Sequence, residues 1–260
     1  MEFAKSKDGT FIAFDRFGNG PVVILVSGAF IDRTHAFNVE LSKALASRFT
    51  VINYDRRGRG KSGNTKPYAV EREIEDLGAL IAAAGGSAGV LGVSSGAVLT
   101  LKAVAYGLAI EKLALFEPPF MLAQADRPPA DHELQLNRFI EAGQRVEATR
   151  YFMTRVMGMP AIVPLLMRFT PYWARSVALA HTLPYESAIM GDFSLPEKLV
   201  ACVQIPTLVL GGSKSPKPLR EAVWAVAGSI PNAQGRLLEG QAHNVSVKVL
   251  APELERFFSA

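Results

Sequence analysis

The sequence has little cysteine, a small net charge and no long uninterrupted apolar segment. Cys202 is the only cysteine among 260 residues, which excludes an intrachain disulfide and a zinc site built from cysteine pairs. This cysteine usage fits a reducing cytoplasm, the location that we expect. The formal net charge of +4 is too small and too dispersed to indicate a nucleic-acid surface. The first residues contain no apolar segment typical of a signal peptide.

The apolar content is nevertheless high enough for a large core, because 49% of the residues are hydrophobic. The longest apolar stretch, residues 90–110, is interrupted by serines, a lysine and two glycines. It therefore predicts a strand, a turn and a helix rather than a membrane span. We expect a globular protein that binds neither a membrane nor a nucleic acid.

Short apolar runs alternate with segments of helical character. Buried strands are expected at 22–26, 49–54, 88–93, 112–116 and 207–210, with a weaker one at 235–238, and helices at 36–48, 69–84, 95–108, 218–229 and 246–259. This alternation predicts an α/β fold with a mostly parallel sheet and helices on both faces. An Asp-Gly turn at 7–9 separates two further strands, so we expect an antiparallel hairpin at the start and antiparallel edge strands.

The pattern changes between residues 121 and 195. Strand-like runs disappear there, and helical pieces rich in methionine and aromatic residues are separated by prolines. We predict a core domain of residues 1–120 and 196–260 and a helical cap, or lid, of residues 121–195. Most methionine and aromatic side chains at helical spacing pack in a core, but some should face the space that the cap covers.

The run Gly-Val-Ser-Ser-Gly at 92–96 is the strongest chemical signal. It follows a predicted strand and precedes a predicted helix, the context in which a G-x-S-x-G pattern forms a nucleophile elbow. Glycine neighbours let the chain turn sharply while the serine hydroxyl points into a cleft. We therefore predict that Ser94 is a nucleophile and that Ser95 contributes its backbone N–H.

With this motif the chain resembles the α/β-hydrolase superfamily, and three further segments agree. Residues 27–30 correspond to the superfamily's oxyanion loop, with Ser27 in place of its usual histidine. Residues 54–62 are similar to its D-x-R-G-x-G-x-S turn, so we interpret the basic run 56–61 as structural. Residues 239–244 resemble the loop of its catalytic histidine. The resemblance implies an α/β-hydrolase fold and an oxyanion hole formed by the N–H groups of Ala29 and Ser95.

The chain has four candidate bases for the serine, because it has four histidines. A serine hydroxyl needs such a base near neutral pH. Only His243 follows a terminal core strand, where the superfamily has its base. His35 could touch the substrate or simply begin a helix. His132 and His181 lie in the predicted cap, and we expect them to be packing or surface residues.

The acid is where the sequence departs from the superfamily pattern. The segment after the predicted strand 207–210 has no carboxylate, and Ser215 stands where an aspartate is expected. Glu117 ends the strand after the nucleophile's helix, a position from which some members of the superfamily take their acid. We predict Glu117 as the acid, with a loop-capping role as the alternative and Asp192 as the reserve candidate.

These residues predict acyl transfer from an apolar small-molecule ester or lactone through an acyl-enzyme, with no metal or organic cofactor. A cofactor-free lyase, cyclase or perhydrolase using the same residues is the first alternative, and a ligand receptor the second. We expect a monomer or homodimer. The candidate substrate-binding residues are Phe30, His35, Phe120, Met153, Trp173 and Met190.

Overall fold

The computed structural model describes residues 1–260 and contains one eight-stranded sheet of order β1-β2-β4-β3-β5-β6-β7-β8. The strands are β1 (Glu2–Lys5), β2 (Phe11–Phe17), β3 (Val22–Val26), β4 (Thr50–Tyr54), β5 (Ala88–Val93), β6 (Ile110–Phe116), β7 (Thr207–Gly212) and β8 (Ala233–Leu238). Six neighbouring strands of this sheet, β4-β3-β5-β6-β7-β8, pair in parallel. This arrangement confirms the α/β-hydrolase fold that the sequence predicts.

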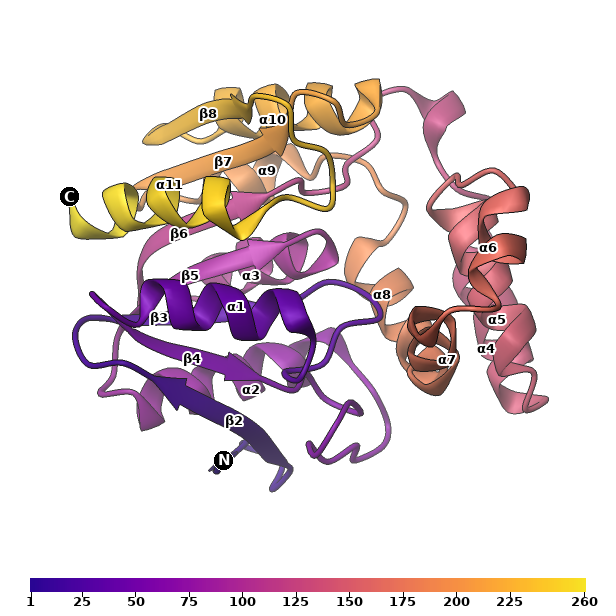
Figure 1. Ribbon diagram of the computed structural model, residues 1–260, viewed down its shortest axis with the longest axis horizontal. Helices are drawn as coiled ribbons and strands as arrows, with labels where there is room; N and C mark the ends of the chain where they lie inside the picture. The colour runs from indigo at the N-terminus through magenta and orange to yellow at the C-terminus, as the bar shows by residue number, and fades with distance from the viewer.

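Helices cover both faces of this sheet. They are α1 (Ala36–Leu45), α2 (Val70–Ala83), α3 (Ser95–Ala105), α9 (Glu197–Ala201), α10 (Lys217–Ser229) and α11 (Val247–Ser259). Alternate residues of a strand point to opposite faces. Accordingly, Val23 and Leu25 pack with α1 and α11, whereas Ile24 and Val26 join the core on the side of α2, α3 and α10. Figure 1 shows these two groups of helices on opposite faces of the sheet.

The N-terminal hairpin forms as predicted, but antiparallel pairing is confined to one edge of the sheet. Gly9 has φ 86°, and the Thr10 N–H donates to Asp8 Oδ1 over 3.0 Å. β2 is antiparallel to both β1 and β4, so β1 runs in the same direction as the six parallel strands. The expected antiparallel edge is therefore the N-terminal one, and β8 at the opposite edge is parallel to β7.

The chain between β6 and β7 is helical. It contains η1 (Gln124–Asp126), α4 (His132–Glu141), α5 (Arg145–Tyr151), the π-helix η2 (Phe152–Val156), α6 (Ile162–Met167), α7 (Pro171–Ala178), η3 (Ala180–Thr182) and α8 (Leu183–Met190). These helices lie beyond the carboxyl ends of the parallel strands, and α8 lies between the sheet and the outer helices (Figure 1). No helix is both long enough and apolar enough to cross a bilayer.

Candidate active site

Ser94 occupies a sharp bend between β5 and α3. Its backbone has φ 55° and ψ −126°, a conformation that a residue with a side chain rarely adopts and that marks strain. The bend is tied to the next strand, because the Ser94 N–H donates to the Phe116 carbonyl over 2.9 Å. It also requires Gly96, since a Cβ there would lie 2.3 Å from the Val26 carbonyl oxygen. The strand ends of β3, β5 and β6 thus fix the serine.

The predicted oxyanion loop lies directly against Ser94. A Cβ on Gly28 would come within 2.9 Å of Ser94 Cβ and 3.4 Å of its Oγ. Phe30 in the same loop has φ 62°, a second strained backbone beside the serine. The N–H groups of Ala29 and Ser95 donate no hydrogen bond within the protein. Both of the backbone donors predicted for an oxyanion hole are therefore free to donate a hydrogen bond to a ligand oxygen.

Glu117 and His243 are in direct contact. The His243 Nδ1 lies 2.6 Å from Glu117 Oε2, although the two residues are 126 positions apart in the chain. Glu117 directly follows β6, with φ 48°, and its N–H donates to the Leu210 carbonyl at 2.8 Å. The carboxylate is wholly buried, whereas the histidine side chain is 35% exposed. The ring is thus held by a buried carboxylate while it stays partly exposed.

The other carboxylate oxygen of Glu117 also accepts hydrogen bonds. Oε1 accepts a hydrogen bond from the Gly212 N–H at 2.7 Å and one from Ser215 Oγ at 2.5 Å. Burial alone would raise the pKa of this carboxyl, but the hydrogen bonds from His243, Gly212 and Ser215 outweigh it and lower the pKa below its ordinary value of 4.5. Glu117 is therefore ionised near neutral pH. Sequence reasoning identified Ser215 by its position, but not this hydrogen bond.

The loop that carries His243 is fastened to the end of β7. The Lys214 N–H donates to the Gln241 carbonyl at 2.8 Å, and the Gly240 N–H donates to Ser213 Oγ at 2.9 Å. Ser94 Oγ forms no hydrogen bond with His243, whose ring bonds to Glu117. Such contacts commonly tighten only when a substrate binds.

The remaining candidate histidines and the reserve acid have other partners. Asp192 is exposed and accepts hydrogen bonds from Ser194 and Arg127, so it does not contact His243. His132 is buried between Ser187 Oγ and the Gly191 carbonyl, and His181 contacts the Gly58 carbonyl at 2.7 Å. His35 is half-buried at the N-terminus of α1; its Nδ1 has no partner, and burial lowers its pKa.

The apolar candidates for substrate binding are mostly packed. Phe30, Phe120, Met153 and Met190 are buried members of the same core cluster, and Trp173 packs against it partly exposed. The Phe30 ring meets Phe152 of the π-helix edge-on, with centroids 5.5 Å apart. These contacts explain their burial, and a role in substrate binding stays a prediction for each of them.

The basic run predicted to be structural forms buried ion pairs. Arg57 binds Asp76 through Nε at 2.9 Å and Nη2 at 2.7 Å, and Arg56 binds Glu73 through two bonds of 2.8 Å. Arg56 and Arg59 both also bind Glu186 of α8. Nothing in the local sequence around Glu186 indicates this pairing, because its partners lie about 130 residues away.

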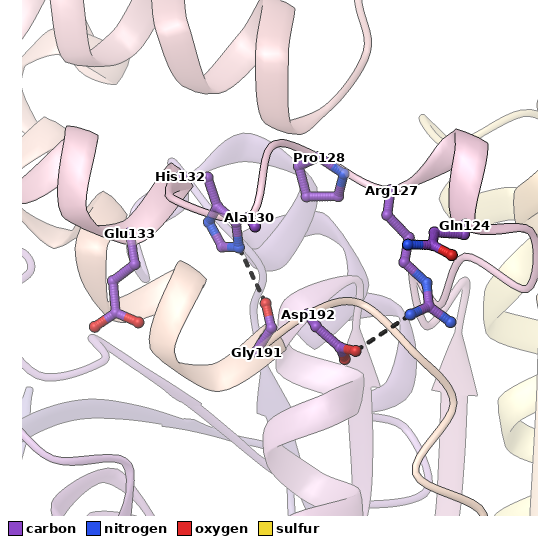
Figure 2. A pocket seen from close by; sticks show the side chains of 8 residues that line it. All are labelled: Gln124, Arg127, Pro128, Ala130, His132, Glu133, Gly191 and Asp192. Atoms are coloured by element: carbon purple, nitrogen blue, oxygen red, sulfur yellow. Dashed lines mark hydrogen bonds and ion pairs between the residues drawn. The ribbon is translucent and has the colours of Figure 1, made fainter.

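A separate polar cavity of about 480 Å³ lies in the helical segment between β6 and β7. Its lining residues are Gln124, Arg127, Pro128, Ala130, His132, Glu133, Gly191 and Asp192 (Figure 2). An ion pair of 3.2 Å joins Arg127 to Asp192 across it. Since Ser94, Glu117 and His243 are all absent from this lining, the cavity is distinct from the strand-end site.

Comparison with known proteins agrees with this fold. A model described as "Alpha/beta hydrolase family" matches residues 23–250. The chain is 49% identical to an alpha/beta hydrolase from Sphaerobacter thermophilus, covering 99% of this chain and 100% of that one with a TM-score of 0.93. It is also 36% identical over 97 residues to the uncharacterized hydrolase YraK of Bacillus subtilis; this match covers 36% of the chain and only 35% of YraK.

More distant solved structures share the fold. The esterase RhEst1 from a Rhodococcus species is 20% identical, with coverage of 100% of this chain and 98% of that one and a TM-score of 0.75. The enol-lactonase from Burkholderia xenovorans is 19% identical, with full coverage of both chains and a TM-score of 0.73.

Proposed function

The chain belongs to the alpha/beta hydrolase family, and we propose that it is a serine hydrolase that cleaves a carboxylic ester or lactone through an acyl-enzyme on Ser94. The observation that carries this proposal is the 2.6 Å contact between Glu117 and His243 beside the strained Ser94 bend. A carboxylate that accepts Nδ1–H leaves Nε2 of the ring free to act as a base. This is the arrangement that a serine nucleophile needs.

In the proposed reaction, His243 takes the proton of Ser94 as Oγ attacks the substrate carbonyl. The resulting oxyanion accepts hydrogen bonds from the unpaired N–H groups of Ala29 and Ser95. His243 then donates the proton to the leaving oxygen, which gives the acyl-enzyme, and water attacks this intermediate with the same ring as base. The ionised Glu117 stabilises the imidazolium that forms in each step. All proton transfers in this scheme use side chains of the protein.

The helical segment between β6 and β7 supplies the substrate side of the proposal. It lies over the carboxyl ends of the strands, where open α/β sheets bind their ligands. We assign residues 121–195 the role of a cap whose apolar side chains, with Phe30 and His35 of the core, select an apolar acyl group. An esterase and an enol-lactonase share this fold, so the fold accommodates the proposed reaction.

The direct test is labelling with a fluorophosphonate, which reacts with activated serines, together with turnover of p-nitrophenyl acetate and butyrate. The wild-type protein should label and turn over both esters, and Ser94→Ala should lose both properties. Ser47→Ala, which changes an exposed serine just after the C-terminal end of α1, is the matched control and should retain them. Labelling that persists in Ser94→Ala contradicts the proposal. Labelling without turnover of any ester or lactone would instead favour the lyase, cyclase or perhydrolase alternative.

Substrate size is tested by a panel of p-nitrophenyl esters and lactones of graded chain length. If the packed apolar side chains line the acyl pocket, kcat/KM should rise with chain length and then fall beyond a limit set by the pocket volume. Each methylene should change kcat/KM by about tenfold to 200-fold near that limit. A flat profile would contradict an acyl pocket under the cap.

A further inference from the structure

One carboxylate from α8 is buried directly beneath the nucleophile bend. Glu186 is only 1% exposed, and its Oε2 accepts a hydrogen bond of 2.5 Å from the Ser95 hydroxyl. The same oxygen accepts a bond of 3.0 Å from Arg56 Nη1, while Oε1 accepts one from Arg59 Nη2. Glu186 thus holds the side chain of the residue whose backbone N–H forms one half of the proposed oxyanion hole.

The two arginines connect the same carboxylate to the other half. Arg56 Nη1 also donates to the Ser27 carbonyl at 3.1 Å. Arg59 Nη1 donates to the carbonyls of Gly28 at 2.6 Å and Ile31 at 2.8 Å. These carbonyls lie on both sides of Ala29, whose N–H is the second proposed donor. A single buried group therefore spans the two chain segments that must converge on the oxyanion.

The charges around Glu186 balance. Glu73 completes the cluster through its two bonds to Arg56, so two buried guanidinium groups face two buried carboxylates. A neutral cluster does not oppose a negative charge that develops at Ala29 and Ser95, whereas an unpaired buried carboxylate would. Burial alone would raise the pKa of Glu186, but Arg56, Arg59 and the Ser95 hydroxyl lower it, so the group is ionised.

The helix that carries Glu186 is itself fixed to the core. The Tyr185 ring stacks on Tyr68 with centroids 3.8 Å apart and planes 3° from parallel. The Tyr185 hydroxyl contacts Lys66 Nζ at 2.5 Å and donates to Asn64 Oδ1 at 2.9 Å. These contacts of the neighbouring residue anchor α8 against the core next to Glu186.

We propose that Glu186 is a positioning residue, which sets the spacing between the Ser95 and Ala29 N–H donors and so couples the helical segment to the oxyanion hole. This inference rests on the proposed function and names a residue on which it depends. Glu186 acts through Ser95 and the two arginines and does not itself touch the reacting atoms.

The test compares Ser95→Ala and Glu186→Gln with Asp76→Asn. Ser95→Ala keeps the backbone N–H and removes only the hydroxyl that binds Glu186. Asp76→Asn is the matched control, because Asp76 is an equally buried carboxylate on an arginine, Arg57, that does not contact the oxyanion loop. For each variant we would measure kcat and KM with p-nitrophenyl butyrate, the inhibition constant of phenylboronic acid, which forms a tetrahedral adduct with an active-site serine, and the thermal midpoint.

Displaced donors weaken binding of the transition state more than binding of the substrate. Glu186→Gln should lower kcat by about 100-fold, the cost of a misplacement near 1 Å, and Ser95→Ala by about tenfold, the loss of one hydrogen bond to a charged group. KM should change little, and the binding of phenylboronic acid should weaken in proportion to the fall in kcat/KM. Asp76→Asn should lower the thermal midpoint while keeping kcat and the inhibition constant close to the wild-type values.

The inference is overturned if Ser95→Ala and Glu186→Gln change kcat and boronic-acid affinity no more than Asp76→Asn does. It is also overturned if all three variants raise KM alone. A wild-type protein without Ser94-dependent turnover would show a different failure, since the proposed function itself would then be wrong and this inference would fall with it. Ser95→Ala keeps the test decisive if Glu186→Gln does not fold, because Glu186 retains both arginines in that variant.

Discussion

Ser215 donates a hydrogen bond of 2.5 Å to the buried carboxylate of Glu117. The serine stands at the position after β7 where the superfamily resemblance implies an aspartate, and the glutamate comes from the end of the neighbouring strand β6. Parallel neighbours lie about 4.8 Å apart, so both positions reach the same place at the edge of the sheet. The two residues together provide what one aspartate would: a carboxylate at His243 and a link to the loop after β7.

Removing the charge of Glu117 should disable the proposed base. In Glu117→Gln the ring loses the group that stabilises its cation and fixes its tautomer, so we expect kcat to fall by about 10⁴. Steady-state turnover of p-nitrophenyl butyrate measures this. A fall of less than about tenfold would contradict a role for Glu117 as the acid and leave the loop-capping alternative, since such a change is well below that of an acid-to-amide substitution in a triad.

The close approach of Ser215 and Glu117 suggests that the acid can be moved. Adding Ser215→Asp to Glu117→Gln places a carboxylate on the loop after β7, and we expect it to restore part of the lost kcat. Ser215→Asn in the same background is the matched control, because it has the same size without the charge. Equal activity of the two double variants would show that position 215 cannot supply an acid to His243.

Ser215→Ala should destabilise the protein and make its acid unfolding begin at higher pH. The change removes one hydrogen bond to a buried charge, which costs about 1.5–3 kcal/mol, and it removes one of the groups that lower the pKa of Glu117. Urea unfolding between pH 3 and 7 measures both effects. Ser229→Ala is the control, because that hydroxyl bonds only to a carbonyl of its own helix; an equal effect of the two variants would contradict the prediction.

The lowered pKa of Glu117 predicts the sign of a pH effect on stability. A native pKa below the ordinary value of 4.5 means that ionised Glu117 stabilises the fold fully above pH 4.5, and that this contribution is lost as the pH falls through the native pKa. The difference in unfolding free energy between wild type and Glu117→Gln should therefore shrink from pH 6 to pH 3. A difference that stays constant over this range would show that the native pKa of the Glu117 carboxyl is not lowered.

The close packing around the serine bend predicts that Gly96→Ala is harmful. The added Cβ would lie 2.3 Å from the Val26 oxygen, so either β3 or the bend must move. We expect a loss of about 1–3 kcal/mol in unfolding free energy and a loss of Ser94 labelling. Gly228→Ala is the control; its Cβ would meet open space in α10, and we expect a gain of about 0.5–1 kcal/mol. Comparable stability of the two variants would contradict the packing argument.

The sequence predicts the interior strands well and the edge of the sheet less well. β3 and β5 match their predicted bounds because both faces are covered, so every residue is apolar or small. β8 is two residues longer than predicted, since it is an edge strand whose partly buried and exposed residues alternate as far as the buried Leu238. β6 is an interior strand, yet it begins at Ile110 rather than Lys112, because the exposed Glu111 and the partly exposed Lys112 interrupt the apolar run.

The same limit applies to the candidate site. Ser94 and His243 are candidates that the sequence alone predicts, because each carries a local motif whose pattern and flanking elements specify one backbone geometry. The bonds of Glu186 and Ser215 could not be found in this way. Each depends on a partner 91 or more residues distant, and no local pattern encodes which carboxylate meets which arginine or hydroxyl.

The helical segment between β6 and β7 also affects the order in which the protein can fold. β6 and β7 pair from Leu113 to Thr207, so this contact closes a larger loop than any other strand pair in the sheet. Large loops close slowly, and the pairing that joins the two parts of the sheet is therefore expected late. The contact between Glu117 and His243 spans this closure. During refolding, recovery of activity should therefore lag behind formation of the N-terminal strands and helices. Enzymatic turnover would then report on the final assembly step.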